Sequence, residues 1–593
     1  MARGFRKKRK LPPAATKIDG VEPRTPIAPV VEIGWKAVLL RVAVIAAMVV
    51  WIYLPVVHGY WLWDDKELIR DSALNHDPAG WWKIWSQPGN LVDFYPLWST
   101  VVWLQWRFWG GDTTGYHLVN ILLHLLGALL VWRLLAKFGL RSAWMGGLLF
   151  AIHPVQVESV AWISELKNTL SLPPFLLAVC AWIDYDAHHR RRDYFLALGF
   201  FIVAMLCKTT MAMFPFVILL HAWWKRGRIQ PADLKAGAPF FAVSLVLGII
   251  TVWFQNQHAI GGMEIPMGGV ESRVALSATS LAFYFAQCIC PVGLLPVYPK
   301  WSIVPPSPLQ MLPWLVLFGL LGACWLKRAS WGRHVLLGLG FFVLNLAPFL
   351  GFTKAFYMSF SWTVDHNLYL PVIGLAGLAV AGLELAERRL MPAPRAVIAV
   401  FAGIVAAAFV TESRDYAKIF LNQEALWTYT LQRNPEAWPG LNNLGNVLLN
   451  SGRPGEAMVD FKKALRLHPH DFRIYNNLGN AFFALGQNSK AMDHYRAAIE
   501  IDPGYDMAHT NLGIALVRAG RDPEAAAEFK AALAINPHSA LAHENLGSLD
   551  MRAGHADDAV REFDAVLRDD PHYAEFQTKM QKQKSDSKSS DGN

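Results

Sequence analysis

The sequence predicts an all-α protein with two parts, a bundle of membrane-spanning helices and a solenoid of short helical repeats. Apolar runs of about 15–25 residues, the length of a helix that crosses a bilayer, recur up to about position 412. The remaining chain is polar and carries a Leu-Gly pair every 34 residues. A chain of 593 residues is also too long for one ordinary domain.

These patterns divide the chain into four segments. We expect a basic cytoplasmic tail (1–35), a polytopic membrane domain (36–415), a repeat domain (416–572, with four repeats from about 437) and a disordered tail (573–593). The net charge of +9 does not indicate nucleic-acid binding, because the basic residues form short clusters between apolar runs. The first apolar run, Ala37 to Val57, is long enough to span, so we expect no cleavable signal peptide.

Eleven spanning helices can be placed in the membrane domain. They lie near 37–57, 115–136, 143–160, 168–184, 194–207, 210–224, 236–254, 311–326, 334–350, 369–386 and 396–412. With the N-terminus in the cytoplasm, an odd number of spans places the repeats outside it. All five basic clusters then fall on the cytoplasmic side: Arg3–Lys10, Arg190–Arg192, Lys225–Arg228, Lys327–Arg333 and Arg388–Arg395. The apolar segment Val274–Val297 fits a re-entrant element, an interfacial element or a further span.

The Leu-Gly pairs belong to a tetratricopeptide pattern. They occur at Leu444-Gly445, Leu478-Gly479, Leu512-Gly513 and Leu546-Gly547. Each is followed at fixed offsets by an alanine, an aromatic residue and a proline: Ala457, Ala491, Ala525 and Ala559; Phe461, Tyr495, Phe529 and Phe563; Pro469, Pro503, Pro537 and Pro571. We expect glycine and alanine to allow close helix contact, the aromatic to fill the gap between neighbouring repeats, and proline to end each second helix. A helix over Leu421–Arg433 should join the repeats to the membrane domain.

Two adjacent acids, Asp64 and Asp65, follow the first spanning helix in the predicted outer loop. Carboxylates at the edge of a membrane are costly unless they have a function. They could act as a general base on a hydroxyl or hold a divalent metal ion, whose involvement the sequence leaves open. A simple helix cap is the structural alternative.

Further polar residues lie at membrane depth or at outer helix ends. His117, Asn120 and His124 share a helix face, which suits interhelical hydrogen bonds or a metal. The stretch from His153 to Asn168 interrupts an apolar run, and in it Glu158 and Glu165 are seven residues apart, as on one face of a helix.

A lysine and two late polar residues complete the set. Lys208 lies between two short apolar runs and needs an anion, either a carboxylate or a lipid phosphate. Asp365 and His366 lie at the outer mouth of a late helix. Acids, histidines and lysines together suit a sugar carried on a lipid phosphate, because acids can bind hydroxyls while bases bind phosphate.

These motifs resemble those of membrane proteins that join a C-type glycosyltransferase fold to tetratricopeptide repeats, the transmembrane-and-TPR protein O-mannosyltransferases and their bacterial relatives. The resemblance covers roughly residues 36–572. It rests on Trp63-Asp64-Asp65, Tyr95-Pro96-Leu97, Tyr116 to Asn120 with His124, Phe150 to Asn168, Lys208, and Leu368 to Pro371. The run His153-Pro154 to Trp162 is the most specific of these motifs.

The resemblance implies a polyprenyl-phosphate-linked sugar, typically mannose, as donor and a Ser or Thr hydroxyl of a protein as acceptor. It implies that Asp64 is the base, with Asp65 beside it, and that Lys167 and Lys208 face the lipid phosphate. The animal enzymes tend to have Tyr-Arg-Pro where this chain has Phe94-Tyr95-Pro96, so the role of that arginine does not carry over.

Our interpretation is a glycosyltransferase in a bacterial inner membrane, with the N-terminus in the cytoplasm and with repeats outside it that recruit a protein or peptide acceptor. Its partners would be the lipid-linked sugar, the acceptor and membrane lipids, and its substrate-binding set would include His117, His153, Glu158, Glu165, Lys167, Lys208, Asp365 and His366. The alternatives are a non-catalytic scaffold that assembles envelope proteins through the repeats, and a transporter or flippase. Polar residues that gather at one membrane face argue against the transporter.

Overall fold

The computed structural model describes residues 34–259, 265–389 and 392–569 of the chain. All regular elements in these ranges are helices, α1 to α25 with short 3-10 and π segments between them. The basic cluster Arg3–Lys10, most of the predicted N-terminal tail and the predicted tail 573–593 lie outside the described residues. Since the described residues form helices as their regular elements, the predicted all-α class is confirmed.

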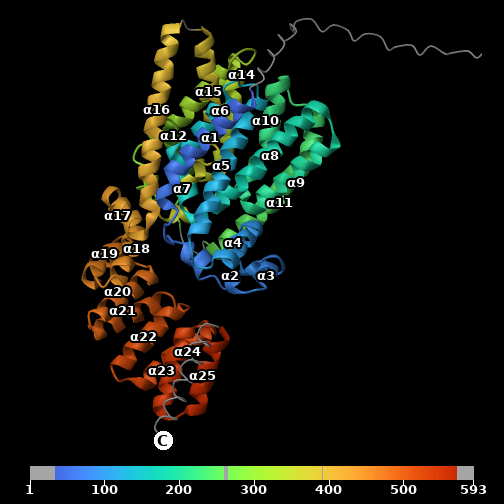
Figure 1. Cartoon of the computed structure of the whole chain (residues 1–593). Coiled ribbons are helices and arrows are strands. Elements are labelled where there is room, and N and C mark those ends of the chain that lie inside the picture. Colours follow the sequence, from blue (N-terminus) through green and yellow to red (C-terminus); the bar gives the residue numbers. More distant parts are fainter. Residues whose placement is uncertain (1–33, 260–264, 390–391, 570–593) are drawn as a thin grey trace, which may run out of the picture.

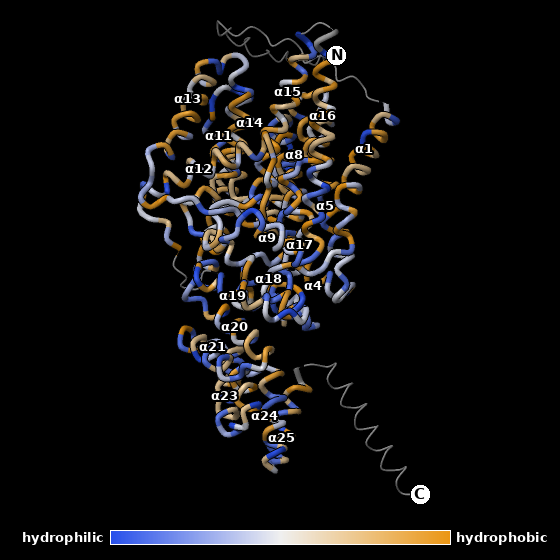
Figure 2. Tube along the Cα trace, turned by 90° about the vertical axis from the view of Figure 1, so that its left-hand side faces the viewer, coloured by the Kyte–Doolittle hydropathy of each residue, from blue (hydrophilic) through white to orange (hydrophobic). Residues whose placement is uncertain are grey.

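The membrane part is a bundle with the repeats below it in Figure 1. Its helices are α1 (Trp35–Tyr53), α4 (Pro96–Trp109), α5 (Thr114–Lys137), α6 (Ala143–Ile152), α7 (Val157–Ala161), α8 (Leu166–His188), α9 (Arg191–Cys207), α10 (Phe214–Arg226), α11 (Pro231–Phe254), α12 (Val270–Ile289), α13 (Leu312–Leu326), α14 (Gly332–Leu346), α15 (Val372–Arg389) and α16 (Pro392–Lys418). The short helices α2 (Ala73–His76) and α3 (Gly80–Ser86) belong to the long loop after α1. Apolar residues dominate the bundle helices in Figure 2, whereas the repeats alternate between polar and apolar residues.

Seven helices among the described residues are long and apolar enough to cross a membrane, compared with the eleven spans expected from the sequence. The other four expected spans do coincide with helices, but α6, α9 and α10 are short and α15 is charged at its end. The span expected over 143–160 is wrong beyond Ile152, where α6 ends, because Pro154 cannot continue the helix. The segment Val274–Val297 forms most of α12 and then an irregular stretch, and α12 is not among the seven.

The basic clusters gather at one end of the bundle. Lys137 at the end of α5 bonds to Asp184 of α8 at 2.6 Å, and Arg226 of α10 pairs with Asp186 of α8 at 2.6 Å. The repeats lie at the opposite end, where the amide of Tyr60, just after α1, donates to the carbonyl of Leu421 at 2.9 Å. This separation agrees with the charge pattern from which the topology was inferred.

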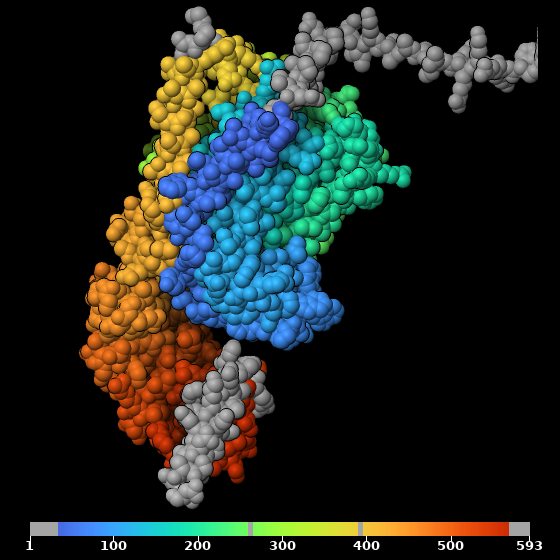
Figure 3. Space-filling model, in the orientation of Figure 1, coloured from blue at the N-terminus to red at the C-terminus, as the bar shows by residue number. Residues whose placement is uncertain are grey.

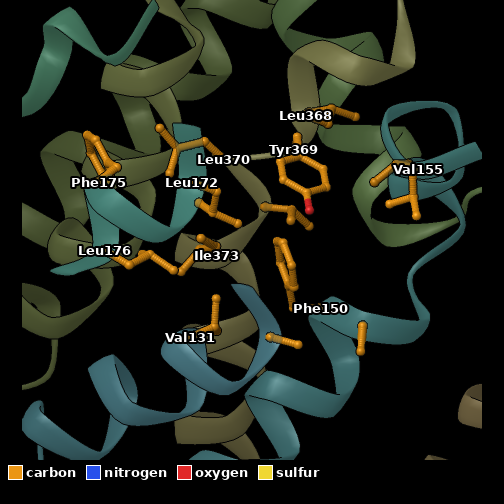
Figure 4. Packing of buried hydrophobic residues seen from close by; sticks show 14 of the residues in the cluster. Val131, Phe150, Val155, Leu172, Phe175, Leu176, Leu368, Tyr369, Leu370 and Ile373 are labelled. Carbon is orange, nitrogen blue, oxygen red and sulfur yellow. The ribbon is translucent and has the colours of Figure 1, made fainter. Parts of the chain in front are cut away.

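The core of the bundle forms where α5, α6, α8 and the start of α15 meet. Figure 4 shows Phe150, Leu172 and Tyr369 among the packed side chains of this core. The Tyr369 hydroxyl lies 2.9 Å from Nδ1 of His124, so a polar pair between α5 and the turn before α15 is satisfied inside the apolar core.

The repeat domain is a stack of helix pairs, α18/α19 (Trp438–Asn450, Pro454–Leu467), α20/α21 (Phe472–Ala484, Asn488–Ile501), α22/α23 (Asp506–Arg518, Asp522–Ile535) and α24/α25 (Ala540–Ala553, Ala556–Asp569). The joining helix α17 spans Gln423–Arg433, close to its predicted position. Pro469, Pro503 and Pro537 each follow the end of a second helix, as expected, while Pro571 lies outside the described residues.

The repeat glycines are needed for packing within each repeat. A β-carbon on Gly445, Gly479 or Gly513 would lie 2.5 Å from the ring of the aromatic residue in the second helix of the same repeat. The aromatic therefore fills the gap between the two helices of its own repeat, and not only the gap between neighbouring repeats that the sequence indicated.

We expect Gly479→Ala to destabilise the repeat domain by about 1–3 kcal/mol, because the added methyl group overlaps the Tyr495 ring. Thermal unfolding of the full chain in detergent, followed by circular dichroism, measures the change. Gly455→Ala is the matched control, since a β-carbon there meets nothing within 4 Å. Equal transitions for both variants would contradict the packing argument.

Candidate active site

The two aspartates after α1 lie in a tight turn and have different surroundings. Asp65 is fully buried, and its carboxylate accepts hydrogen bonds from the amides of Leu62 at 2.9 Å and Ser164 at 2.8 Å. Asp64 is partly exposed, and its Oδ1 accepts one from the Ser164 hydroxyl at 2.8 Å. Asp65 thus ties the turn to the backbone at Ser164, and Asp64 is the more accessible of the two acids.

The buried segment between α6 and α8 supplies the residues that face Asp64. After Ile152 the chain forms a 3-10 turn (Pro154–Gln156), the short helix α7 and a second 3-10 turn (Ile163–Glu165) before α8 begins. Glu158 and Glu165 therefore do not share one continuous helix face, contrary to the spacing argument, because Trp162 is extended between the two turns of helix.

Both glutamates nevertheless converge on His366. Oε1 of Glu158 lies 3.1 Å from Nδ1 of His366, and the backbone amide of His366 donates to Oε2 at 3.2 Å. Glu165 lies 4.0 Å from the same imidazole nitrogen. The loop before α15 is thereby joined to the segment between α6 and α8.

Two lysines lie within this group of acids. Lys167 pairs with Glu165 at 3.0 Å, and Lys208, between α9 and α10, donates to Oδ1 of Asn168 at 2.5 Å. Asn168 in turn donates to Glu165. Both lysines are thus held in place by neighbouring side chains rather than free in solvent.

Asp93 also lies among these acids, although the sequence analysis did not single it out. It is partly exposed just before α4, and it is near enough to Lys167 and Lys208 for both to lower its pKa, although burial raises that pKa more. Asp93 could have been identified from the sequence by its position two residues before the Tyr95-Pro96-Leu97 motif. We call the set Asp64, Asp93, Glu158, Glu165, Lys167, Lys208 and His366 the charged cluster.

Burial raises the pKa of Asp64 to about 6, although Lys167 and the Ser164 hydroxyl act in the opposite direction. Burial also raises the pKa of Asp65 well above its usual range. At neutral pH Asp64 is therefore mostly ionised and close to the pKa at which a carboxylate is an effective general base.

Three of the predicted site residues, His117, His153 and Asp365, are buried and contact other parts of the fold. His117 is buried against the backbone at Gly59, and Nε2 of His153 lies 3.0 Å from the carbonyl of Cys288. Asp365 is fully buried and accepts hydrogen bonds from the hydroxyls of Tyr298 at 2.8 Å and Tyr416 at 3.2 Å. These contacts tie segments of the fold together and leave little room for a substrate.

A narrow hollow, with room for about one water molecule, adjoins the charged cluster. Its walls include Asn168, Thr210, Asn345, Phe349 and His366. Within the described ranges no three His, Cys, Asp or Glu side chains are placed to hold a metal ion together. The arrangement can accept a proton at Asp64 and can offset negative charge at the two lysines.

Two parts of the chain match known protein families. Residues 94–254 match the family described as dolichyl-phosphate-mannose-protein mannosyltransferase. Residues 445–486 and 479–520 match a TPR repeat family, and residues 516–582 match a further tetratricopeptide repeat family.

The curated relatives are protein O-mannosyl-transferases. Tmtc3 of Drosophila melanogaster is 23% identical over 442 residues, which cover 60% of this chain and 46% of the relative. TMTC1 of Homo sapiens is 24% identical over 446 residues, which cover 66% of this chain and 49% of the relative. The chain thus spans about half the length of the curated relatives it matches.

Among solved structures, the crystal structure of MamA aligns with 25% of this chain and 88% of its own, at 25% identity and a TM-score of 0.23. The chain combines a match to a mannosyltransferase family in its membrane part with tetratricopeptide repeats. As its motifs indicated, the chain is therefore similar in sequence to protein O-mannosyl-transferases.

Proposed function

We propose that the protein transfers a sugar, mannose in the first instance, from a polyprenyl-phosphate donor to Ser or Thr hydroxyls of a protein acceptor. The observation that carries the proposal is the placement of Asp64, a partly exposed acid beside Lys167. Glu165 and Asn168 link Lys167 to the second lysine, Lys208. A base next to one fixed cation, with a second cation in the same cluster, suits a transfer that releases a phosphate.

In the proposed reaction, Asp64 takes the proton of the acceptor hydroxyl as its oxygen attacks the anomeric carbon of the sugar. The bond between that carbon and the phosphate oxygen breaks, and polyprenyl phosphate leaves with the electron pair. Lys167 and Lys208 offset the charge that grows on the phosphate. Attack from the side opposite the leaving group inverts the anomeric configuration.

The remaining acids and the histidine hold these groups in position. Glu165 orients Lys167, and through Asn168 it also fixes Lys208. Glu158 holds His366 at the rim of the hollow, where an imidazole can bind a sugar hydroxyl. Asp365, with its two tyrosine partners, supports the loop that carries His366.

The proposed orientation places the charged cluster and the repeats outside the cytoplasm of a bacterial cell. The basic ends of the bundle helices face the opposite way, where the positive-inside rule places them. On this orientation the repeats lie below the bundle, at the end where α2 and α3 of the loop after α1 also lie (Figure 1). A protein acceptor bound to the repeats would then be on the same side of the membrane as Asp64.

We expect Asp64→Asn to lower the rate of transfer by about 10²–10⁴-fold with the fold unchanged, since the amide cannot accept the hydroxyl proton. The measurement is mass spectrometry of envelope glycopeptides from a deletion strain complemented with each variant. Asp71→Asn, in the same loop but exposed and paired with Arg70, is the control. Hexosylation of Ser/Thr peptides that persists in the Asp64→Asn strain would contradict the assignment.

The pH dependence of kcat/KM should show an acid limb near pH 6. The pKa of Asp64 is raised to about 6, so below that pH the carboxylate is protonated and the rate should fall about tenfold per pH unit. Purified protein with a polyprenyl-phosphate mannose donor and a threonine peptide serves for the measurement. A rate that stays constant down to pH 4 would show that Asp64 is not the base.

Cysteine labelling tests the orientation. We expect a membrane-impermeant maleimide to label Ser548→Cys, an exposed position in the last repeat, in intact spheroplasts of a strain whose exposed Cys290 is replaced by serine. Labelling that appears only after the cells are permeabilised would place the repeats in the cytoplasm.

A further inference from the structure

The residue before Asp64 has an unusual backbone conformation. Trp63 has a φ of 39°, and it and His189 are the two non-glycine residues with positive φ in the part of the chain that the structure describes. A bulky side chain in this region is strained and keeps the conformation only where its surroundings enforce it. The contacts that enforce it therefore also determine where Asp64 points.

The Trp63 ring is enclosed by aromatic residues from three distant segments. It stacks on Trp162 at 5.4 Å, and it meets Phe360 at 5.2 Å and Trp427 edge-on at 4.8 Å between ring centroids. Trp162 precedes Ser164, which bonds Asp64, so this contact belongs to the site itself. Trp427 is fully buried and lies on α17, the helix that leads into the repeats.

Hydrogen bonds also fasten the residues before Asp64 to the start of α17. The amide of Tyr60 donates to the carbonyl of Leu421, and the side-chain amide of Gln423 donates to the carbonyl of Trp61 at 3.4 Å. Asp65 closes the turn on its other side through the amides of Leu62 and Ser164. In Figure 3 the orange surface that includes α17 lies directly against the blue surface of the first part of the chain.

The first repeat rests on Trp427. A β-carbon on Gly440 of α18 would lie 3.3 Å from the Trp427 ring and 3.2 Å from Leu431, so the backbone of α18 touches the indole directly. A line of contacts thus runs from Gly440 of the first repeat through Trp427 and Trp63 to Asp64.

We propose that Trp427 is a positioning residue: it transmits the docking of the first repeat to the strained turn and thereby sets the orientation of the Asp64 carboxylate. The repeats are then part of the support of the active site as well as a surface for the acceptor. This inference rests on the proposed function of Asp64 as the base.

A reporter at position 64 tests the positioning without any need for activity. Asp64→Cys in the Cys290→Ser background is labelled with an impermeant maleimide in purified full-length protein. We expect Trp427→Ala to raise the labelling rate about fivefold or more, because a strained turn without its support relaxes toward solvent. Trp427→Phe, which keeps an aromatic contact, should stay within about twofold of the parent. Equal rates in all three proteins would overturn the proposal.

A second variant leaves Trp427 in place. Gly440→Val inserts side-chain atoms against the indole and should change the labelling rate in the same direction. Gly455→Val should not, since a β-carbon at Gly455 meets nothing within 4 Å. Trp438→Ala removes another indole, one that stacks on His468 at 4.6 Å, and controls for general loosening of the repeats. A response to Trp438→Ala as large as that to Trp427→Ala would also overturn the proposal.

Transfer kinetics separate this inference from the function. With Asp64 restored, Trp427→Ala should lower kcat for a short threonine peptide at least about tenfold and leave KM within about twofold, because the base is misaligned while binding is kept. A rise in KM alone would mean that Trp427 acts in acceptor binding, which contradicts the positioning role. If the parent transfers no sugar but the labelling responds as expected, the proposed function fails and the mechanical connection stands.

Discussion

The structure depends on one electrostatic constraint: charged side chains inside a bundle of apolar helices must be paired. Four acids, two lysines and a histidine meet that requirement together, with Glu165 between Lys167 and His366. An unpaired carboxylate or ammonium at this depth would cost far more than a surface charge. Glu158 and Glu165 lie in the irregular segment between α6 and α8 and both reach the imidazole of His366.

The helices of both parts could be predicted from the sequence, because they are encoded in local periodicity and apolar length. The repeats follow a 34-residue pattern, and Gly479 and Tyr495 are as close in space as that pattern requires. The helices of the membrane part were also predicted, since apolar length is a local property. The number of helices that cross a membrane was less predictable, because α9 and α10 are short and their ends depend on buried neighbours.

The site was predicted as a set of residue types, but its internal arrangement was not. Asp64 and Asp65 are adjacent in sequence, yet only the fold shows that Asp65 is enclosed by two backbone amides. Asp93 is nearly thirty residues from Asp64 and joins the charged cluster only through Lys167 and Lys208. His153 belonged to the most specific motif, but its partner is a carbonyl on α12. Such pairings are tertiary contacts, and periodicity in one sequence carries no information about them.

The membrane part and the repeat domain are in direct contact through α17, which bears on why they occur in one chain. A separate recruiting domain would need only a tether. Here both ends of α17 are bonded to the membrane part. The carbonyl of Leu421, just before α17, accepts from the amide of Tyr60, and the side-chain amide of Asn434, just after it, donates to the carbonyl of Val297 at 3.1 Å, in the stretch after α12. The α12 stretch continues to Tyr298, which holds Asp365 next to His366. The joining helix therefore supports both sides of the charged cluster. Under the proposed function, a shift of the first repeat would act on Asp64 and His366 together and so would couple acceptor binding to the chemistry.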